Sequence, residues 1–381
     1  MPGSVIVSYA RTPIGKLSGA LASLTAMDLG GRAIQGALER GGVGPEQVDY
    51  VVMGQVLQAG QGQITARQAA EKAGIPMSVP AITINKVCLS GLNAVYLADQ
   101  MIQAGDAEIV VAGGMESMTN APYLLPKARA GYRMGNGELV DSLIQDGLWC
   151  AFDAVHMGSG TERYTGQFGG LTREAQDELA AKSHERAAVA QKEGRFAGEI
   201  VPVQIPQRKG DPILVEEDEG VRPETTAESL GRLKPAFDAD GSITAGNASQ
   251  ISDGGAAIVV ASRSKADELG LTPVAELVSF GMVAGPDTSL LQQPSRAIKR
   301  ALEPIDKTVP DLDLVELNEA FAAVGLASMK DLGISDDIVN VNGGAIALGH
   351  PIGMSGARVL ITLVNELHRR GGGLGAAALC G

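Results

Sequence analysis

The chain repeats a stretch of its own sequence, because Arg32-Ala-Ile-Gln-Gly-Ala-Leu-Glu39 returns as Arg296-Ala-Ile-Lys-Arg-Ala-Leu-Glu303. The same offset carries Asp49-Tyr-Val-Val-Met-Gly54 onto Asp313-Leu-Val-Glu-Leu-Asn318. A helix pattern, a short connection and a buried-type strand therefore repeat in register. A repeat unit of this length indicates a duplicated domain rather than a solenoid. We expect an α/β protein with two similar halves, each built on a mainly parallel sheet covered by helices.

The repeat extends to residue types that carry chemistry. Cys88-Leu-Ser-Gly91 in the first half corresponds to His350-Pro-Ile-Gly-Met-Ser-Gly356 in the second. Each is followed by a helix-like segment and a strand, and the opening strand at residues 4–8 has its counterpart at 274–280. Cys88 and His350 are thus pseudo-equivalent and lie at strand ends, where parallel-sheet proteins place their active sites.

Residues 120–247 separate the two halves and differ from them in composition. They hold eight of the thirteen aromatic residues of the chain, which favours a ligand-facing cleft, although a small separate core would give the same composition. Residues 173–193 predict an amphipathic helix with Thr172 as its N-cap and Gly194 as its stop, and residues 204–223 predict an exposed loop. We interpret the segment as an insertion that supplies a substrate surface. The predicted domains are 1–119 plus 248–272, 120–247 and 273–381.

Composition excludes several classes of protein. A chain of 381 residues is too long for one ordinary core, and a net charge of −13 argues against a nucleic-acid surface. No apolar run approaches the length of a membrane span. The three cysteines, Cys88, Cys150 and Cys380, have no metal-type spacing and fit a reducing compartment. With no signal segment at its start, the chain is expected to be cytoplasmic.

Cys88 stands between a strand-like run (79–84) and a helix-like run (92–104). A cysteine near a helix N-terminus has a lowered thiol pKa, which favours the reactive thiolate; the alternative is an inert core thiol. Asn318 and Cys380 lie at further strand ends of the second half. If they converge with Cys88 and His350, the four side chains supply a nucleophile, a base, a polarising group and an acid.

Five blocks, taken together and in this order, resemble the thiolase family over essentially the whole chain. They are Asn85-Lys-Val-Cys88-Leu-Ser-Gly91, Gly113-Gly-Met-Glu-Ser-Met118, Asn318-Glu-Ala-Phe321, Asn342-Gly-Gly-Ala-Ile-Ala-Leu-Gly-His350-Pro-Ile-Gly353 and Cys380-Gly381. The resemblance implies duplicated βαβαβαββ halves in a five-layer αβαβα arrangement, with an inserted loop domain.

The resemblance also implies roles for the four candidate catalytic residues. Cys88 would accept the acyl group and His350 would be the base that activates it. Cys380 would move a proton on the attacking or leaving acyl group. Asn318 would hold a water that, with His350, stabilises the enolate of the second thioester.

Substrate contacts follow from the resemblance in the same way. His156 and Met157 correspond to the motif where short acyl chains and pantetheine bind, Ser249 to a pantetheine contact and Arg222 to a residue near the adenine. Leu148 and Phe321 would line an apolar tunnel, although ordinary core packing explains them equally well. Elsewhere, His184 and His368 lie on polar helical stretches and Cys150 in an apolar segment, so we expect no catalytic role for them.

The activity implied is a reversible Claisen condensation of two acetyl-CoA molecules to acetoacetyl-CoA and CoA, or the reverse thiolysis, through an acyl-Cys88 intermediate. No cofactor and no metal are implied, because coenzyme A is a substrate and product. Neither nucleic acid nor membrane is an expected partner, and the family implies a homodimer or homotetramer.

Two alternatives remain open, the first two below, and two further classes are rejected on the residues present. A broader-chain 3-ketoacyl-CoA thiolase of fatty-acid β-oxidation would use the same residues. A non-catalytic CoA-thioester-binding protein would need a lost catalytic residue, and none of the four is lost. A cysteine hydrolase explains neither Cys380 nor the duplication. A condensing enzyme for carrier-protein substrates would carry other residues at Asn318 and Cys380.

The family pattern continues beyond the Cys380-Gly381 block. The resemblance implies a further glycine-rich turn and a last strand, and one glycine of that turn donates a hydrogen bond to the oxyanion hole of the acyl-enzyme. The sequence given ends at Gly381. We therefore expect the second half to be described without its final strand.

Overall fold

The computed structural model describes residues 4–381; residues 1–3, included in the first predicted domain, lie outside the described residues. Its larger sheet has the strand order β13-β1-β12-β5-β3-β4. The strands are β1 (Ser4–Arg11), β3 (Tyr50–Gly54), β4 (Ala81–Ile84), β5 (Ile109–Ser117), β12 (Ser252–Ser262) and β13 (Ala275–Glu276), with β2 (Gly15–Lys16) paired to β12.

This sheet is mixed, so the prediction of a mainly parallel sheet was wrong for the first half. β3 runs parallel to both β4 and β5, whereas β12 runs antiparallel to both β1 and β5. The reason lies in the connection. Parallel neighbours need a crossover, usually a helix, and β12 follows the long insertion instead.

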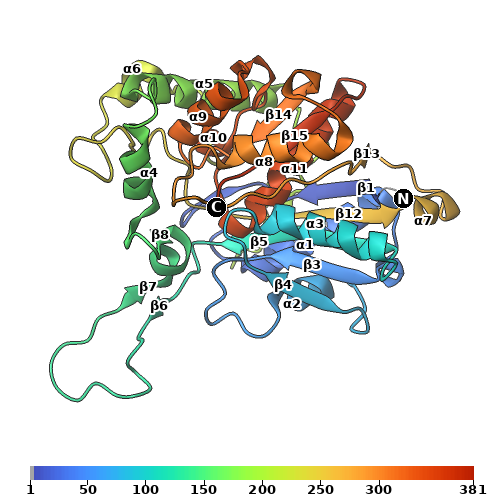
Figure 1. Ribbon diagram of the computed structural model, residues 1–381. Coiled ribbons are helices and arrows are strands. Elements are labelled where there is room, and N and C mark those ends of the chain that lie inside the picture. Colours follow the sequence, from blue (N-terminus) through green and yellow to red (C-terminus); the bar gives the residue numbers. More distant parts are fainter. Residues whose placement is uncertain (1–3) are drawn as a thin grey trace.

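Helices and strands alternate in five layers, which confirms the predicted αβαβα arrangement (Figure 1). Helices α1 (Ala26–Gly41) and α2 (Thr65–Lys72) cover one face of the larger sheet, and α3 (Ser90–Ala104) and α11 (Ile352–Arg369) cover the other. The parallel pair β14 (Leu314–Leu317) and β15 (Gly375–Ala378) packs on the far side of α11. The outermost layer contains α8 (Gln293–Leu302) and α9 (Ala322–Leu332).

Residues 274–280 do not form the strand of the second half that the repeat predicts. Only β13 is extended there, and it pairs antiparallel with β1 at the edge of the first sheet. The segment satisfies backbone groups at the edge of β1 instead: Val274 N donates to Ile6 O at 2.8 Å, and Leu277 N donates to Ser4 O at 3.0 Å. The predicted pseudo-equivalence of the two opening strands was therefore wrong.

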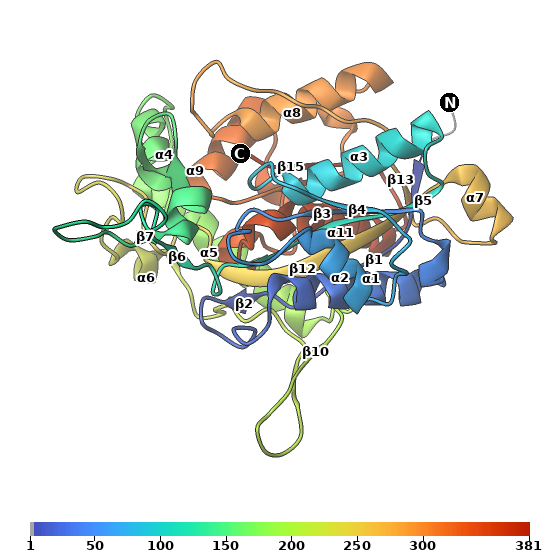
Figure 2. The same ribbon diagram turned by 90° about the horizontal axis from the view of Figure 1, so that it is seen from below.

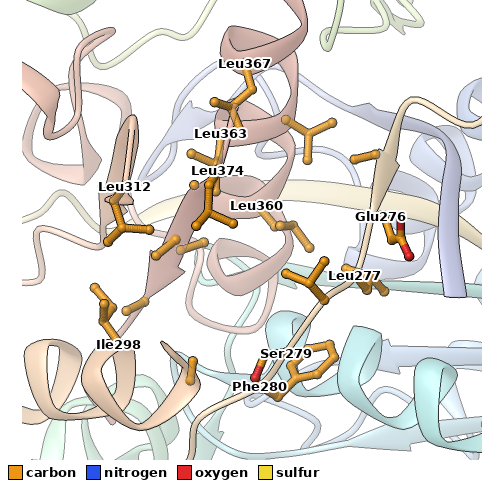
Figure 3. A pocket seen from close by; sticks show the side chains of 18 of the residues that line it. Glu276, Leu277, Ser279, Phe280, Ile298, Leu312, Leu360, Leu363, Leu367 and Leu374 are labelled. Atoms are coloured by element: carbon orange, nitrogen blue, oxygen red, sulfur yellow. The ribbon is translucent and has the colours of Figure 1, made fainter. Parts of the chain in front are cut away.

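An apolar groove of about 520 Å³ lies between β15 and residues 274–281 (Figure 3). Leucine side chains of α11, among them Leu360, Leu363 and Leu367, line it together with Phe280 and Ile298. Within residues 4–381, β15 pairs with β14 alone. Leu89 and Leu379, the direct neighbours of two candidate catalytic residues, also line the groove.

The insertion contains the helix that its sequence predicts, but the predicted amphipathic pattern was wrong, because the buried face of this helix carries polar side chains, among them Gln176, Asp177 and His184, beside its alanines. Helix α5 (Arg173–Lys192) begins after Thr172, whose side chain accepts a hydrogen bond from Ala175 N. It ends before Gly194, which has a φ of +69°. The prediction of an exposed loop at residues 204–223 was wrong in part. That stretch contains a projecting hairpin (Figure 2) and the buried Asp218, which pairs with Arg11 at 2.7 Å.

The remaining elements are short. In the insertion they are β6 (Tyr123–Leu124), β7 (Val140–Asp141), a π-helical turn (Leu143–Leu148), β8 (Trp149–Cys150), β9 (Val155–His156), α4 (Met157–Thr165), β10 (Val203–Ile205), β11 (Ile213–Val215) and α6 (Ala227–Gly231). Elsewhere they are α7 (Arg263–Glu268), α10 (Ala345–Leu348) and 3₁₀ turns at Pro45–Gln47, Glu303–Ile305, Val309–Asp311 and Asp336–Ile338.

Glycines bring the first turns of α3 and α11 into contact. A Cβ atom at Gly91 would stand 2.6 Å from Ala357 N, and one at Gly356 would stand 2.3 Å from Leu92 N. Only residues without a side chain allow backbones to approach so closely. The close approach places the segments before these helices, which carry Cys88 and His350, next to each other.

Candidate active site

Cys88 lies in a tight turn between β4 and α3. The preceding residue, Val87, has a φ of +49°, a left-handed conformation that is rare and strained for a β-branched side chain. Two side chains hold the turn: Asn85 Oδ1 accepts from Val87 N at 3.0 Å, and Ser90 Oγ accepts from Lys86 N at 2.8 Å. The turn thus fixes a half-buried thiol two residues before the helix begins.

His350 faces that thiol from the other half of the molecule. It lies between helices α10 and α11, so the prediction that it follows a strand was wrong. Its Nε2 atom is 3.1 Å from Cys88 Sγ. Its backbone N donates to Gln250 O at 3.0 Å. The repeat predicted that these two residues meet, and the structure brings them into hydrogen-bond contact.

Ser355 determines which nitrogen of His350 carries the proton. Ser355 Oγ lies 2.6 Å from His350 Nδ1 and donates its own proton to Pro351 O at 2.9 Å. Since a hydroxyl has one proton to donate, the serine oxygen accepts from Nδ1–H. We therefore assign the lone pair to Nε2, which points at the Cys88 thiol as a base must.

Burial keeps both members of this pair neutral. It lowers the pKa of His350 to about 3, with Arg358 adding to the effect, so the imidazole is uncharged at neutral pH. Burial, together with the neighbouring Cys380, raises the pKa of the Cys88 thiol. The expectation of a lowered thiol pKa was therefore wrong, because the effect of burial exceeds that of the opposing backbone hydrogen bond. The resting pair is a thiol and an imidazole, and a proton moves only as the thiol attacks.

Asn318 follows β14, is fully buried and lies next to His350. Its Nδ2 atom is 3.4 Å from His350 Nε2, and its backbone N donates to Ala378 O at 3.0 Å. Within residues 4–381 its Oδ1 atom has no hydrogen-bond partner. Buried amide oxygens are nearly always satisfied, so this atom is suited to accept from a water or from a bound ligand.

Cys380 follows β15 and is buried. Burial raises the pKa of its thiol to about 12. It packs in one cluster with Phe321 and Met157. The next residue, Gly381, lies against the turn of the nucleophile, since a Cβ atom there would stand 3.6 Å from Cys88 N. The four predicted catalytic residues thus converge, with two contributed by strand ends of the second half.

The predicted substrate residues surround this centre from several sides. Leu148 packs in the same apolar cluster as Cys88, and Ser249 N donates to Ala320 O at 3.0 Å. A row of rings leads outward from Phe321, with centroid separations of 6.2 Å to Phe237, 6.2 Å from there to His156, and 5.0 Å on to Trp149.

Arg222 makes none of these contacts, and it is held by His184, for which the sequence predicted no role. Its backbone N donates to His184 Nδ1 at 3.1 Å. His184 was expected on a polar face but is 1% exposed, because α5 turns it inward beneath the loop that carries Arg222. Burial, then the charge of Arg222, lowers the pKa of His184 to about 4.

Sequence reasoning also missed Ser355, Phe237 and Trp149. Ser355 lies in the first turns of the helix that follows His350, and that spacing was the available signal. The two aromatic residues gave no signal beyond their place in the insertion. No group of three or more His, Cys, Asp or Glu side chains within residues 4–381 could hold a metal ion. In the same range, no helix is both long enough and apolar enough to cross a membrane.

Comparison with known proteins assigns the family. Residues 4–264 match the family model "Thiolase, N-terminal domain", and residues 271–381 match "Thiolase, C-terminal domain". The chain belongs to the thiolase family. The resemblance read from the five sequence blocks is thereby confirmed, together with the thiolase fold.

Individual thiolase relatives are similar over their full length. The probable acetyl-CoA acetyltransferase of Mycolicibacterium smegmatis is 58% identical over 99% of this chain and 97% of that protein. The acetyl-CoA acetyltransferase of Cupriavidus necator is 56% identical over 100% of this chain and 96% of that protein. The crystal structure of the Bacillus anthracis acetyl-CoA acetyltransferase has a TM-score of 0.96 at 43% identity, covering 100% of this chain and 96% of that one.

The buried His184 generates a prediction about acid stability. A histidine whose pKa falls from about 6.5 in the unfolded chain to about 4 in the fold contributes stability that is present above pH 6.5 and lost as the pH falls towards 4. Replacing it by His184→Gln should therefore reduce the loss of unfolding free energy between pH 7 and pH 4 by roughly 3 kcal/mol. Urea denaturation at both pH values measures this difference.

The exposed His368 provides a matched control. A His368→Gln variant should show the same loss of unfolding free energy between pH 7 and pH 4 as the unsubstituted protein. If His184→Gln also showed the full loss, the burial of His184 would not contribute to acid sensitivity.

Proposed function

We propose that this thiolase is an acetyl-CoA C-acetyltransferase, which condenses two acetyl-CoA molecules to acetoacetyl-CoA and CoA and also catalyses the reverse thiolysis. The observation that carries the proposal is the contact of 3.1 Å between Cys88 Sγ and the unprotonated Nε2 of His350. The names of full-length relatives at 52–58% identity support the same activity.

In the first step, Cys88 Sγ attacks the carbonyl carbon of acetyl-CoA while its proton passes to His350 Nε2. The C–S bond to coenzyme A then breaks, and the departing CoA sulfur takes the proton from His350. The products are acetyl-Cys88 and CoA. A positioned base of this kind contributes roughly 10²- to 10⁴-fold in rate.

In the second step, the Cys380 thiol gives its proton to His350 Nε2, and the resulting thiolate removes a proton from the methyl carbon of a second acetyl-CoA. The enolate oxygen that develops is stabilised by donors from His350 and from a water held by Asn318, whose free Oδ1 supports this role. Loss of one such donor typically costs about 10²- to 10³-fold in rate. The enolate carbon attacks acetyl-Cys88, and the Cys88–acyl bond breaks to release acetoacetyl-CoA. The departing Cys88 sulfur takes the proton from His350 Nε2, which restores two thiols and a neutral imidazole.

Six residues would hold the CoA substrate. His156, Met157, Leu148 and Phe321 bound the acyl and pantetheine region, Ser249 contacts the pantetheine arm, and Arg222 lies near the adenine. The row of rings from Trp149 to Phe321 includes two of these proposed acyl-binding residues, His156 and Phe321, and such bulky side chains support a preference for short acyl chains.

No cofactor enters this mechanism, since coenzyme A is a substrate and product. We propose a cytoplasmic location, which the three free cysteines support. We also propose a homodimer or homotetramer. β4 is the outer strand of the larger sheet, and its Ile82 is 43% exposed. An unpaired apolar strand edge is a natural template for pairing with a second chain.

Chain-length preference tests the proposed activity. Thiolysis of acetoacetyl-CoA should exceed that of 3-oxoacyl-CoAs with longer chains, which is measured by loss of the 3-oxoacyl-CoA absorbance at fixed CoA. Comparable rates on long chains would favour the broader 3-ketoacyl-CoA thiolase. Absence of any CoA-dependent turnover would favour a binding protein.

The two cysteines should separate the two steps. Cys88→Ala should abolish the acetyl adduct that intact-mass analysis detects after acetyl-CoA is added. Cys380→Ala should still form the adduct but fail to condense it with a second acetyl-CoA. An adduct that persists in Cys88→Ala would refute the nucleophile assignment, and normal condensation by Cys380→Ala would refute the role of Cys380. Cys150→Ala is the matched control and should behave as the unsubstituted protein.

A further inference from the structure

A buried carboxylate outside the catalytic constellation connects the two segments that carry Cys88 and His350. Glu116 lies on β5, in the middle of the larger sheet, and is 0% exposed. Its Oε2 atom accepts from Val56 N at 2.9 Å and from Gly353 N at 3.0 Å, and its Oε1 atom accepts from Leu57 N at 3.2 Å. Three backbone donors from two distant segments therefore converge on one side chain.

Both segments bound the candidate nucleophile and base. Val56 and Leu57 follow β3 and pack, together with Ile352, in the apolar cluster that contains Cys88. Gly353 lies in the first turn of α11, between His350 and the Ser355 that orients its ring. A bond from Glu116 to either segment thus acts on one wall of the catalytic centre.

The backbone segments around Glu116 are packed so closely that the hydrogen bonds of Glu116 fix their positions relative to one another. A Cβ atom at Gly353 would stand 2.7 Å from Gln55 Cα and 2.9 Å from Glu116 Oε2. A Cβ atom at Gly114 would stand 2.0 Å from Gly353 O. The start of α11 therefore lies directly on β5 and on the end of β3, and Glu116 occupies the point where the three meet.

Only a carboxylate satisfies this set of donors. A glutamine offers one acceptor oxygen and one donor amide, so one of the three backbone N–H groups would face another N–H. Burial raises the pKa of Glu116 to about 7, with the charge of Asp253 adding to the effect, while the three N–H groups oppose it. An ionised carboxylate at this depth costs free energy. We attribute the presence of this carboxylate to the two backbone segments that its hydrogen bonds hold in place.

We propose that Glu116 is a positioning residue that sets the approach of His350 to Cys88 by holding the start of α11 against the end of β3. It touches neither thiol nor imidazole, and it acts through the backbone of Gly353 and Leu57. This rests on Cys88 and His350 acting as proposed above. A displacement of about 1 Å in such a pair can cost on the order of 100-fold in rate.

The test measures the Cys88–His350 pair directly in Glu116→Gln and Glu116→Ala. At pH 8, alkylation of Cys88 by iodoacetamide, followed by peptide mass spectrometry, should slow about 10- to 100-fold. Glu116→Ala should be slower than Glu116→Gln, because glutamine keeps its bonds to Val56 and Gly353. In steady state kcat should fall while the KM for acetyl-CoA stays unchanged, since Glu116 does not touch the substrate.

A matched control lies at the other end of the same helix. Glu366 is buried, accepts from Asn342 Nδ2 at 3.0 Å and pairs with Arg369 and Arg370. Glu366→Gln should lower the melting temperature without changing the alkylation rate of Cys88. A purely structural Glu116 would behave in the same way, which would overturn the proposal.

The outcomes separate this proposal from the proposed function. Alkylation needs no acyl transfer. A normal alkylation rate in folded Glu116→Gln therefore refutes the positioning role of Glu116, whether or not the unsubstituted enzyme condenses acetyl-CoA. Slow alkylation in Glu116→Gln together with no acetylation of Cys88 in the unsubstituted protein supports positioning and refutes the nucleophile role.

Discussion

The contact between Cys88 and His350 is the interaction on which the rest of the site depends, and it crosses the boundary between the two halves of the duplication. It exists because glycines at the starts of α3 and α11 let the two backbones approach more closely than any side chain would allow. Ser355 orients the imidazole within this contact, and Asn318 and Cys380 are delivered to it by the ends of β14 and β15. The five-layer fold thus brings three strand ends, those of β4, β14 and β15, and the start of α11 to one point.

Burial decides the chemistry of that point. It lowers the pKa of His350 and raises those of both thiols, so the resting centre carries no charge. A neutral pair that is largely withdrawn from solvent costs little to bury, whereas charge that develops during the reaction interacts strongly with fixed donors. The same loss of solvent keeps His184 neutral beneath Arg222. Stability and reactivity therefore have a common physical origin in this protein.

Much of this arrangement could be predicted from the internal repeat of the sequence. Because the repeat aligns Cys88 with His350, their meeting could be predicted without a structure, and the five blocks predicted the layers. The direction of β12, the pairing of residues 274–277 with β1 and the burial of His184 could not be predicted, since each depends on which surface is free once the chain has folded. Glu116 gave no signal of its own role, because its donors lie far from it in sequence.

The most direct measurement of the central claim is the rate at which acetyl-CoA acetylates Cys88 with and without the imidazole of His350. Rapid-quench mass spectrometry on the unsubstituted protein and on His350→Ala gives both rates under one condition. The contact across the two halves predicts that the rate falls roughly 10²- to 10⁴-fold in the variant, while circular dichroism shows the fold unchanged. Equal rates in the two folded proteins would contradict it.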